Sequence, residues 1–309
     1  MANQLTKLLL RTAATTGAAG VGALAWSQVE RVSPVLRRYL VTTGRPASSP
    51  TLRVLHISDL HLFPGQEWLA EWVRGLAEED FDFVVSTGDN FGSVEALPML
   101  QYAYQPLLEY PGAFVLGSND YYSPRAKPWV AYLSKRVRSR QPVRNVPDLP
   151  WYEMAQEWTD AGWVDLSNQA ETLTVTNSSG QDLRLGLIGV DDPHIRRDRM
   201  PATPDGWGDA TTLRLGLTHA PYQRILNEFT TLGVEVAFAG HTHGGQLCVP
   251  GYGAIVTNCD VPRRYAKGLH RWGFGGDSCA LHVSAGLGTA MYAPVRFACR
   301  PEASLLTIR

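Results

Sequence analysis

Side chains that commonly bind metal ions follow several short apolar runs along this chain of 309 residues. Carboxylates and histidines recur there, in part as D-x-H and H-x-H triplets, and an amide lies among them. The candidates are Asp59, His61, Asp89, Asn119, His219, His241 and His243. Two cations held close together need mixed oxygen and nitrogen ligands and one shared carboxylate, so these residue types predict a two-metal hydrolytic site.

The candidates follow segments with the length and composition of buried strands. These predicted strands cover residues 52–58, 81–87, 113–116, 213–218 and 234–239. Helical periodicity separates some of them, most clearly over residues 67–79. Open α/β sheets build their sites at the carboxyl ends of strands, so we expect the candidate side chains to gather there.

Taken in order, these motifs resemble the calcineurin-like metallophosphoesterase superfamily. The family pattern is D-x-H, G-D-x, G-N-H-D/E, a lone His and G-H-x-H. The corresponding residues here are 59–61, 88–90, 117–120, 219 and 240–243. The sequence GHTHGGQ at 240–246 is similar to a bacterial branch that acts on phosphodiester or lipid-linked phosphate substrates. The strand and helix patterns alone indicate an α/β protein. The resemblance, over about residues 51–309, implies a four-layer α/β/β/α sandwich of two mixed sheets flanked by helices.

The resemblance also implies how the ligands divide between two divalent ions, with Asp89 as the bridging carboxylate. The first ion would be held by Asp59, His61, Asp89 and His243. The second would be held by Asp89, Asn119, His219 and His241. Mixed oxygen and nitrogen ligands suit Mn²⁺, Fe²⁺ or Zn²⁺ better than Ca²⁺. A hydroxide bridging the two ions would attack phosphorus in line, and both ions would stabilise the charge that develops.

The implied activity is that of a phosphodiesterase on a phosphodiester or on a lipid-linked or nucleotide-sugar pyrophosphate. A phosphomonoesterase is one alternative. A catalytically weak metal-binding scaffold at the membrane is another, because the family's usual acid histidine is missing. No protein partner is implied by the motifs.

The loop at 117–120 is where the chain departs from the family pattern. Without a gap, Ser118 stands at the ligand Asn, and Asn119 stands at a His that often protonates the leaving group. A one-residue slip instead makes Asn119 the ligand and puts Asp120 at the His position. An amide oxygen binds a divalent ion more readily than a neutral hydroxyl, which favours Asn119. Asp120 is then the candidate acid, provided that burial raises its pKa.

A basic stretch at 121–150 follows this loop directly. It has seven Lys and Arg residues before its first acid, Asp148. We predict an insertion that caps the cleft, in which Arg136 and Arg138 supply positive charge to an anionic headgroup or membrane surface. A solvated basic helix explains the same pattern. Asn90, beside Asp89, is expected to shape its loop or to contact phosphate.

Residues 1–50 carry six Lys and Arg residues and one Glu, and residues 13–26 are rich in Ala, Gly and Thr. That run is marginal for crossing the ~30 Å of a bilayer core. An anchor, a signal peptide, a surface helix and a helix packed on the domain are all compatible with it. The Arg residues after the run favour membrane association, with the catalytic domain at 51–309 on the cytoplasmic side and export as the alternative.

The remaining composition argues for a folded domain and against a nucleic-acid-coating surface, since 44% of residues are hydrophobic and the net charge is −1. The four cysteines have no C-x-x-C spacing and are expected to be free thiols. His56, inside the first strand, and His282 are expected to be structural. Residues 191–194 resemble a family loop near the site, and a turn explains them equally well.

Overall fold

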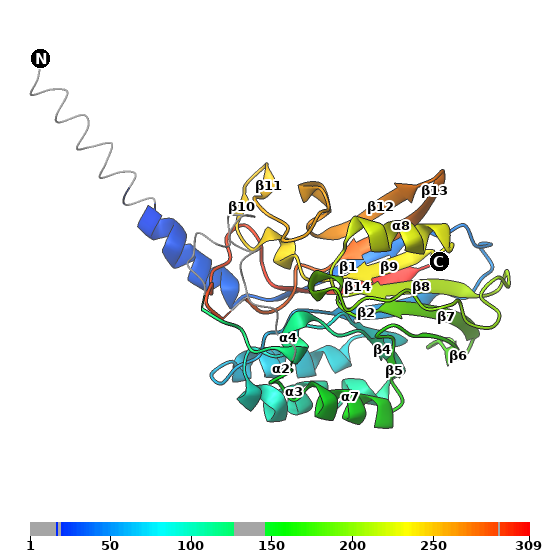
Figure 1. The fold of residues 1–309 in the computed structure, drawn as a ribbon, viewed down its shortest axis with the longest axis horizontal. Coiled ribbons are helices and arrows are strands. Elements are labelled where there is room, and N and C mark those ends of the chain that lie inside the picture. The colour runs from blue at the N-terminus through cyan, green and yellow to red at the C-terminus, as the bar shows by residue number, and fades with distance from the viewer. Residues whose placement is uncertain (1–16, 18–19, 127–145, 290) are drawn as a thin grey trace, which may run out of the picture.

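The computed structural model describes residues 17, 20–126, 146–289 and 291–309. Two six-stranded sheets dominate it (Figure 1). In spatial order, the first contains β1 (Val35–Val41), β14 (Glu302–Ile308), β2 (Leu52–Ile57), β3 (Phe83–Ser86), β4 (Gly112–Phe114) and β5 (Val164–Asp165). The second contains β12 (Gly268–Phe274), β13 (Asp277–Val283), β9 (Val236–Ala239), β8 (Leu213–Thr218), β7 (Asp182–Val190) and β6 (Ala170–Thr176). The short strands β10 (Cys248–Val249) and β11 (Gly253–Ala254) form a hairpin.

Both large sheets are mixed. In the first, β2, β3 and β4 run parallel, whereas β14 runs antiparallel to β2. In the second, β7, β8 and β9 run parallel, and β6 pairs antiparallel with β7. The carboxyl ends of these parallel neighbours therefore lie at a common edge of each sheet, where an α/β fold places its site.

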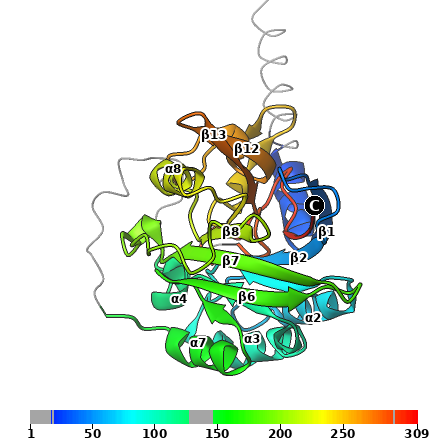
Figure 2. The ribbon, with the colours of Figure 1, turned by 90° about the vertical axis from the view of Figure 1, so that its right-hand side faces the viewer.

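Helices cover the outer faces of the two sheets (Figure 2). Below the first sheet in that view lie α2 (Glu67–Gly75), α3 (Leu97–Tyr104), α4 (Ser118–Tyr121) and α7 (Trp151–Asp160). On the opposite side, α8 (Gln223–Thr231) packs on the second sheet. Short 3₁₀ turns occur at Leu76–Glu78, Val94–Ala96, Leu107–Glu109, Pro193–Ile195, His243–Gly245 and Arg263–Tyr265.

Three hydrophobic clusters bind these layers together. One joins the first group of helices to the first sheet, for example through Trp158 and Phe114. A second fills the space between the sheets, with Val54 from β2 and Phe238 from β9. A third joins α8 to the second sheet through Phe229. Side chains alternate along β2, so both of its faces are buried. The layers follow the order α/β/β/α, which confirms the predicted fold class.

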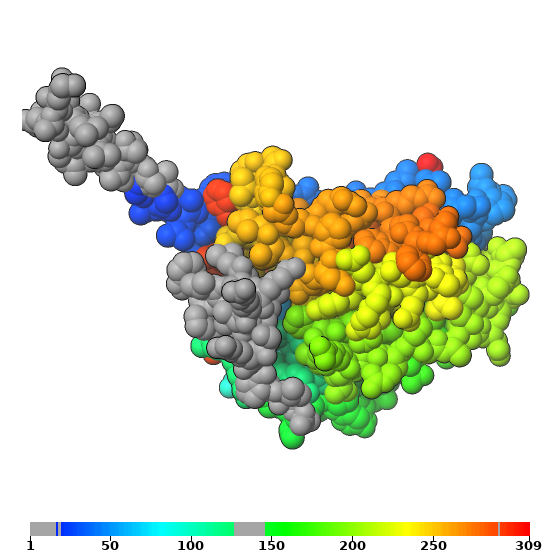
Figure 3. Space-filling model, turned by 45° about the horizontal axis from the view of Figure 1, so that its top comes forward, coloured from blue at the N-terminus to red at the C-terminus, as the bar shows by residue number. Residues whose placement is uncertain are grey.

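The predicted N-terminal segment contributes to the first sheet. Its strand β1 pairs in parallel with β14 over seven residues. Residues 20–31 form a helix that extends from the body of the molecule (Figures 1 and 3). No helix in the described part of the chain is both long and apolar enough to cross a membrane. The predicted domain boundary at residue 50 stays a prediction. It was not anticipated from the sequence that β1, which precedes this boundary, would be a strand of the first sheet.

Two sets of predicted features lie partly or wholly outside the described residues. Arg136 and Arg138, the predicted substrate contacts of the basic insertion, are among them. Residues 13–16, 18 and 19 of the predicted membrane-associating run at 13–26 also lie outside the described residues. Their predicted roles therefore stay predictions. The four cysteines are described, and all are free thiols as expected.

Candidate metal centre

The candidate ligands lie on loops that leave the carboxyl ends of five strands and meet between the sheets. Asp59 and Asp89 follow neighbouring strands, and the amide of Asp59 donates to the carbonyl of Gly88 at 2.9 Å. In the second sheet, the amide of Gly240 donates to the carbonyl of His219 at 2.8 Å. The two sheets are joined here because the amide of His241 donates to both carboxylate oxygens of Asp59 at 3.0 Å.

The side chains converge into two overlapping clusters. Asp59, His61 and His243 form one, and Asp59, Asp89 and His219 form the other. Within each, one possible ligand atom per residue lies within 4.8 Å of the others, and all are buried. The Oδ2 atom of Asp89 lies 3.4 Å from Nε2 of His61 and 3.5 Å from Nε2 of His219. Asp89 therefore occupies the position between two nitrogen ligands that a bridging carboxylate needs.

The histidines face one another across this centre. The Nε2 atoms of His61 and His243 are 3.1 Å apart, and the rings are stacked. Nδ1 of His241 lies 3.3 Å from Nε2 of His219. The other nitrogen of His219, Nδ1, lies 2.7 Å from the carbonyl of Thr87. That contact fixes the ring so that Nε2 points into the centre, as a hydrogen-bonded metal ligand does.

The backbone is strained at the candidate ligands. Positive φ angles occur at Asp59 (52°), His61 (45°), Asp89 (59°), His241 (67°) and His243 (49°). Residues other than glycine seldom adopt this left-handed region, and such strain collects at functional sites. The loops also approach too closely for side chains at some positions. A Cβ atom at Gly240, for instance, would lie 2.5 Å from Oδ2 of Asp59.

Burial and charge set the protonation of the centre. Burial opposes ionisation of Asp89, but His219 outweighs it and holds the pKa of Asp89 well below its usual range. Burial likewise opposes a charge on His219, but Asp89 raises its pKa well above the usual value. Burial lowers the pKa of His61, His241 and His243, which favours neutral rings with a free lone pair. His61, His241 and His243 are thus in the neutral state that binds divalent ions, whereas His219 would have to release its proton to bind a cation.

These residues fit a pair of divalent cations. The centre holds several buried acceptors and few protons to satisfy them. Nδ1 of His61 and Oδ2 of Asp192 are buried without a hydrogen-bond partner among the described residues. Burial raises the pKa of Asp59 to about 7 and that of Asp192 to about 7. These shifts reflect the free energy needed to ionise grouped carboxylates away from water. Cations would offset that cost.

The loop that departs from the family pattern lies beside Asp89. The backbone amide of Asn119 donates to Oδ1 of Asp89 at 2.7 Å, and its side-chain Nδ2 donates to Oδ2 at 2.8 Å. Rotating this side-chain amide by half a turn would present its oxygen at the same place. Ser118 has its hydroxyl 3.4 Å from Nδ2 of Asn119 and begins α4. Asn119 thus contacts the carboxylate of Asp89 through both its backbone and its side chain.

Asp120, the candidate acid, has a different environment. Its two oxygens accept from the backbone amides of Asp89, Asn90 and Gly117 at 2.7–2.8 Å, and from Nδ2 of Asn90 at 3.0 Å. Burial, aided by the charge of Asp89, raises its pKa to about 6. These contacts tie the loop at 117–120 to the loop at 88–90 and favour a positioning role, so the acid role stays a prediction.

Asn90 was predicted to contact substrate or to shape its loop. Its side chain is fully buried, bonded to Asp120, and accepts from the hydroxyl of Tyr104 at 3.4 Å. These contacts favour loop shaping.

The loop after β7 adds His194, a residue that the motifs did not assign, to the surroundings of His241. Asp192 begins the predicted turn, where its Oδ1 accepts from the amide of His194 at 2.7 Å. This turn brings the ring centroid of His194 within 4.4 Å of that of His241. Nδ1 of His194 lies 3.1 Å from the hydroxyl of Tyr222. The signal in the sequence was the position of residues 191–194 after a strand, in line with the other ligand loops.

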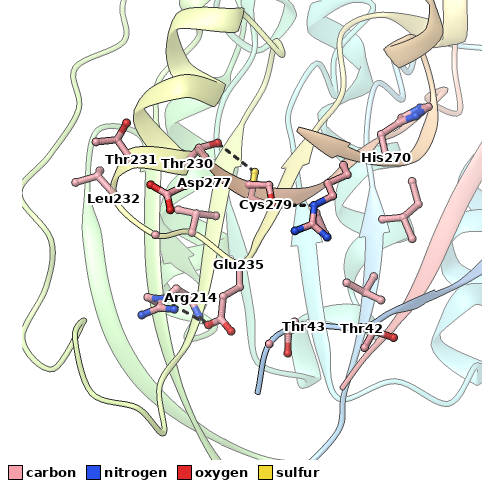
Figure 4. Close-up of a pocket in the computed structure, with 18 of the residues that line it drawn as sticks. Thr42, Thr43, Arg214, Thr230, Thr231, Leu232, Glu235, His270, Asp277 and Cys279 are labelled. Atoms are coloured by element: carbon pink, nitrogen blue, oxygen red, sulfur yellow. Dashed lines mark hydrogen bonds and ion pairs between the residues drawn. The ribbon is translucent and has the colours of Figure 1, made fainter. Parts of the chain in front are cut away.

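A large cavity lies elsewhere, at the amino-terminal ends of β8 and β9 (Figure 4). Its volume is about 970 Å³, and its lining includes Thr42, Thr43, Arg214, Glu235 and Asp277. Arg214 and Glu235 pair across it at 3.5 Å. No candidate metal ligand lines this cavity.

Comparison with known proteins agrees with this centre. A family model for calcineurin-like phosphoesterases matches residues 52–245. The uncharacterized metallophosphoesterase YkuE of Bacillus subtilis (strain 168) is 28% identical over 156 residues, or 49% of this chain and 48% of YkuE. The phosphodiesterase YaeI of Escherichia coli (strain K12) is 28% identical over 148 residues, or 48% of each chain. The match thus spans about half the length of each of these relatives.

Solved structures show weaker likeness. The calcineurin-like phosphoesterase YfkN from Bacillus subtilis aligns with 83% of this chain and 90% of its own, at 12% identity and a TM-score of 0.40. A score this low adds nothing to the description of the fold. The family model carries the assignment, because it covers more than half of the chain and spans all five motif positions in full. By that match, the chain belongs to the calcineurin-like phosphoesterase family.

Proposed function

We propose that this chain is a metal-dependent phosphoesterase that hydrolyses phosphodiesters at a centre for two divalent cations. The observation that carries the proposal is the position of Asp89, whose Oδ2 lies within 3.5 Å of histidine nitrogens from both sheets. A shared carboxylate between two nitrogen ligands is what a two-metal hydrolytic site requires. Buried, strained loops hold it there, so the arrangement exists before any substrate binds.

The proposed ligand sets combine the two side-chain clusters, which share Asp59, with the contacts that Asp89 makes to both His61 and His219. Asp59, His61, Asp89 and His243 would hold one ion. Asp89, Asn119, His219 and His241 would hold the other. When bound, such a pair of Mn²⁺, Fe²⁺ or Zn²⁺ ions lowers the pKa of water and offsets negative charge on phosphoryl oxygens. The chain itself supplies orientation, because Asp120 joins two of the ligand loops and Thr87 orients His219.

Two considerations bear on the substrate: the missing acid histidine favours good leaving groups in either ester class, and a named relative supports diesters. In this chain Asn119 and Asp120 stand where the family has an acid histidine, and Asp120 spends both oxygens on backbone amides. Substrates with good leaving groups, including a lipid-linked or nucleotide-sugar pyrophosphate, need least help from such an acid. The relative YaeI is named as a phosphodiesterase, which supports this choice.

The test is a metal count together with an ester assay. The full chain, which retains β1, is purified without chelators, counted by elemental analysis and assayed with Mn²⁺ on bis-aryl and mono-aryl phosphates. We expect about two ions per chain, faster diester turnover, and loss of turnover in Asp89→Asn but not in Asp277→Asn, an exposed control far from the centre. Faster monoester turnover would replace the diester proposal with the monoesterase alternative. Two ions without turnover on any ester would favour the scaffold.

We also propose that the N-terminal helix contacts a membrane surface. Val21, Leu24, Trp26 and Val29 on helix 20–31 are all more than half exposed, and exposed apolar side chains of this kind suit a lipid interface. Sedimentation of the full chain with anionic lipid vesicles tests this. The double variant Val21→Asp, Leu24→Asp should abolish sedimentation, and unchanged sedimentation would contradict the proposal.

The proposed cap over the site has its own test. Charge reversal of Arg136 and Arg138 should raise the KM for an anionic substrate if the insertion caps the site.

A further inference from the structure

A continuous line of buried polar side chains connects the space between the sheets with Asp59. It consists of His282 on β13, His56 on β2, Thr87 after β3 and Ser58 after β2, here called the buried polar network. The two Nδ1 atoms of His282 and His56 are 2.9 Å apart, and Nε2 of His56 lies 2.9 Å from the hydroxyl of Thr87. Thr87 donates to Ser58 at 2.7 Å, and Ser58 donates to Oδ2 of Asp59 at 2.6 Å. Every member is fully buried.

The carboxylate end determines the direction of every hydrogen bond. An ionised Asp59 only accepts, so Ser58 must donate to it, and Ser58 in turn accepts from Thr87. The hydroxyl of Thr87 must therefore accept from a proton on Nε2 of His56. Nδ1 of His56 is then an acceptor, so Nδ1 of His282 carries a proton. The line needs both histidines neutral, and burial lowers the pKa of both.

The far end of the line agrees with this direction. With Nδ1 of His282 donating, Nε2 of that ring is left as an acceptor. This atom is buried and has no partner among the described residues. An unsatisfied buried acceptor costs free energy. The pair of histidines also lies in the apolar layer between the sheets, with Phe238 against both rings. Apolar side chains would fill that layer without the cost.

Thr87 connects the buried polar network to the second cluster of ligands. The hydroxyl of Thr87 donates to Ser58, which donates to Asp59. The carbonyl oxygen of Thr87 lies 2.7 Å from Nδ1 of His219. A shift of Thr87 would therefore disturb both clusters together. Asp59 has few other restraints, since its remaining side-chain hydrogen bonds come from the amide of His241.

We propose that His282, His56, Thr87 and Ser58 are positioning residues that set the orientation of Asp59 toward its cation, and that Thr87 couples this orientation to His219. The inference rests on the proposed two-metal function but concerns residues outside the ligand set. Partners that orient a metal ligand typically change metal affinity by about 10- to 100-fold when removed. A purely structural network would instead change stability and leave affinity alone.

The test measures Mn²⁺ affinity by competition with a chelator in the full chain. Thr87→Val removes the hydroxyl at nearly constant shape, and Thr87→Ser keeps it. We expect about 10- to 100-fold weaker Mn²⁺ binding in Thr87→Val and near wild-type binding in Thr87→Ser. Ser304→Ala is the matched control, because the hydroxyl of Ser304 is buried beside His56 in the sheet without a described partner. The Mn²⁺ affinity of Ser304→Ala should stay within about twofold of wild type.

A second variant and a stability measurement separate the outcomes. If Thr87→Val does not fold, Ser58→Ala removes the donor to Asp59 from a smaller side chain, with the same expected loss of affinity. Thermal unfolding in chelator shows whether a variant is merely less stable. Unchanged affinity in both variants, or equal loss in Thr87→Val and Thr87→Ser, overturns the proposal. Wild-type chain that binds two ions but hydrolyses no ester contradicts the proposed function alone, and the affinity comparison still decides the role of the network. Wild-type chain without bound Mn²⁺ overturns both.

Discussion

The two ends of strands β8 and β9 differ sharply. At their carboxyl ends, His219, His241 and His243 are buried, closely spaced and, in two of three cases, on left-handed backbone. At their amino ends lies the cavity of about 970 Å³, whose charged residues Arg214 and Glu235 are already paired with each other. The cavity has its charged groups in an ion pair on ordinary backbone, whereas the metal centre has ligands on strained backbone, with Nδ1 of His61 unpartnered among the described residues. Chemistry in this fold is therefore indicated by convergence and strain rather than by volume.

The largest expected difference between the two ends is catalytic. His219→Ala should lower phosphoester turnover by on the order of 10²–10³-fold, the size seen when a charge-stabilising group is lost from an active site. His270→Ala, at the cavity, should leave turnover within about twofold of wild type, the range of ordinary surface substitutions. Steady-state rates on a bis-aryl phosphate with Mn²⁺ make the measurement. Comparable losses in both variants would remove the distinction between the ends.

The next difference concerns packing at glycines. A Cβ atom at Gly240 would lie 2.5 Å from Oδ2 of Asp59, whereas one at Gly44, beside the cavity, would have nothing within 4 Å. Gly240→Ala should therefore lower the free energy of unfolding by about 3 kcal/mol, the cost of overpacking a rigid site. Gly44→Ala should change it by no more than about 0.5 kcal/mol. Urea unfolding of the two variants provides the comparison, and a tolerant Gly240→Ala would show that the ligand loops are not closely packed.

The pH dependence of stability gives a smaller effect. In the metal-free protein, burial lowers the pKa of His219 but Asp89 outweighs it, so the pKa is raised in the folded state. Its stabilisation is fully present below the unfolded value of about 6.5 and is lost as pH rises through the folded pKa. The difference in Tm between wild type and His219→Gln, measured in chelator, should therefore be larger at pH 6 than at pH 9. A difference that grows with pH would contradict the proposed pairing with Asp89.

The smallest effect is expected from the ion pair at the cavity. Glu235→Gln removes the charge that pairs with Arg214 at 3.5 Å. Both side chains are partly exposed, so the loss of stability should be no more than about 1 kcal/mol, with turnover unchanged. Thermal unfolding and the ester assay check the two expectations. Reduced turnover in this variant would give the cavity a functional part.

The sequence carried the ligand positions but not their geometry. Asp59, Asp89 and His219 could be placed at strand ends because each follows a short apolar run and belongs to an ordered motif. Left-handed backbone at Asp59 and Asp89 could not be predicted from residue type, because Asp adopts it more often than most residues but still uncommonly. Asp120 is similar, since four hydrogen bonds from two loops determine its environment.

Two parts of the fold depended on contacts between distant residues. β1 carries Arg37 and Arg38 and resembles a charged flank rather than a strand, and only pairing with β14 at the other end of the chain makes it one. Charged residues of this kind are common on edge strands. His56 was predicted to be a core histidine and His282 only a structural one, and both are buried. Their 2.9 Å contact joins residues 226 positions apart in the chain. Periodicity within a single segment cannot reveal such pairs.

The most direct test of the central claim is the position of bound ions. Crystals of the full chain grown with Mn²⁺ would be examined by anomalous scattering at the manganese edge. Two peaks about 3.5–4 Å apart are expected, one on each side of Asp89. A single peak, or peaks away from Asp89, would contradict the account of Asp89 as the carboxylate shared by two metal ions.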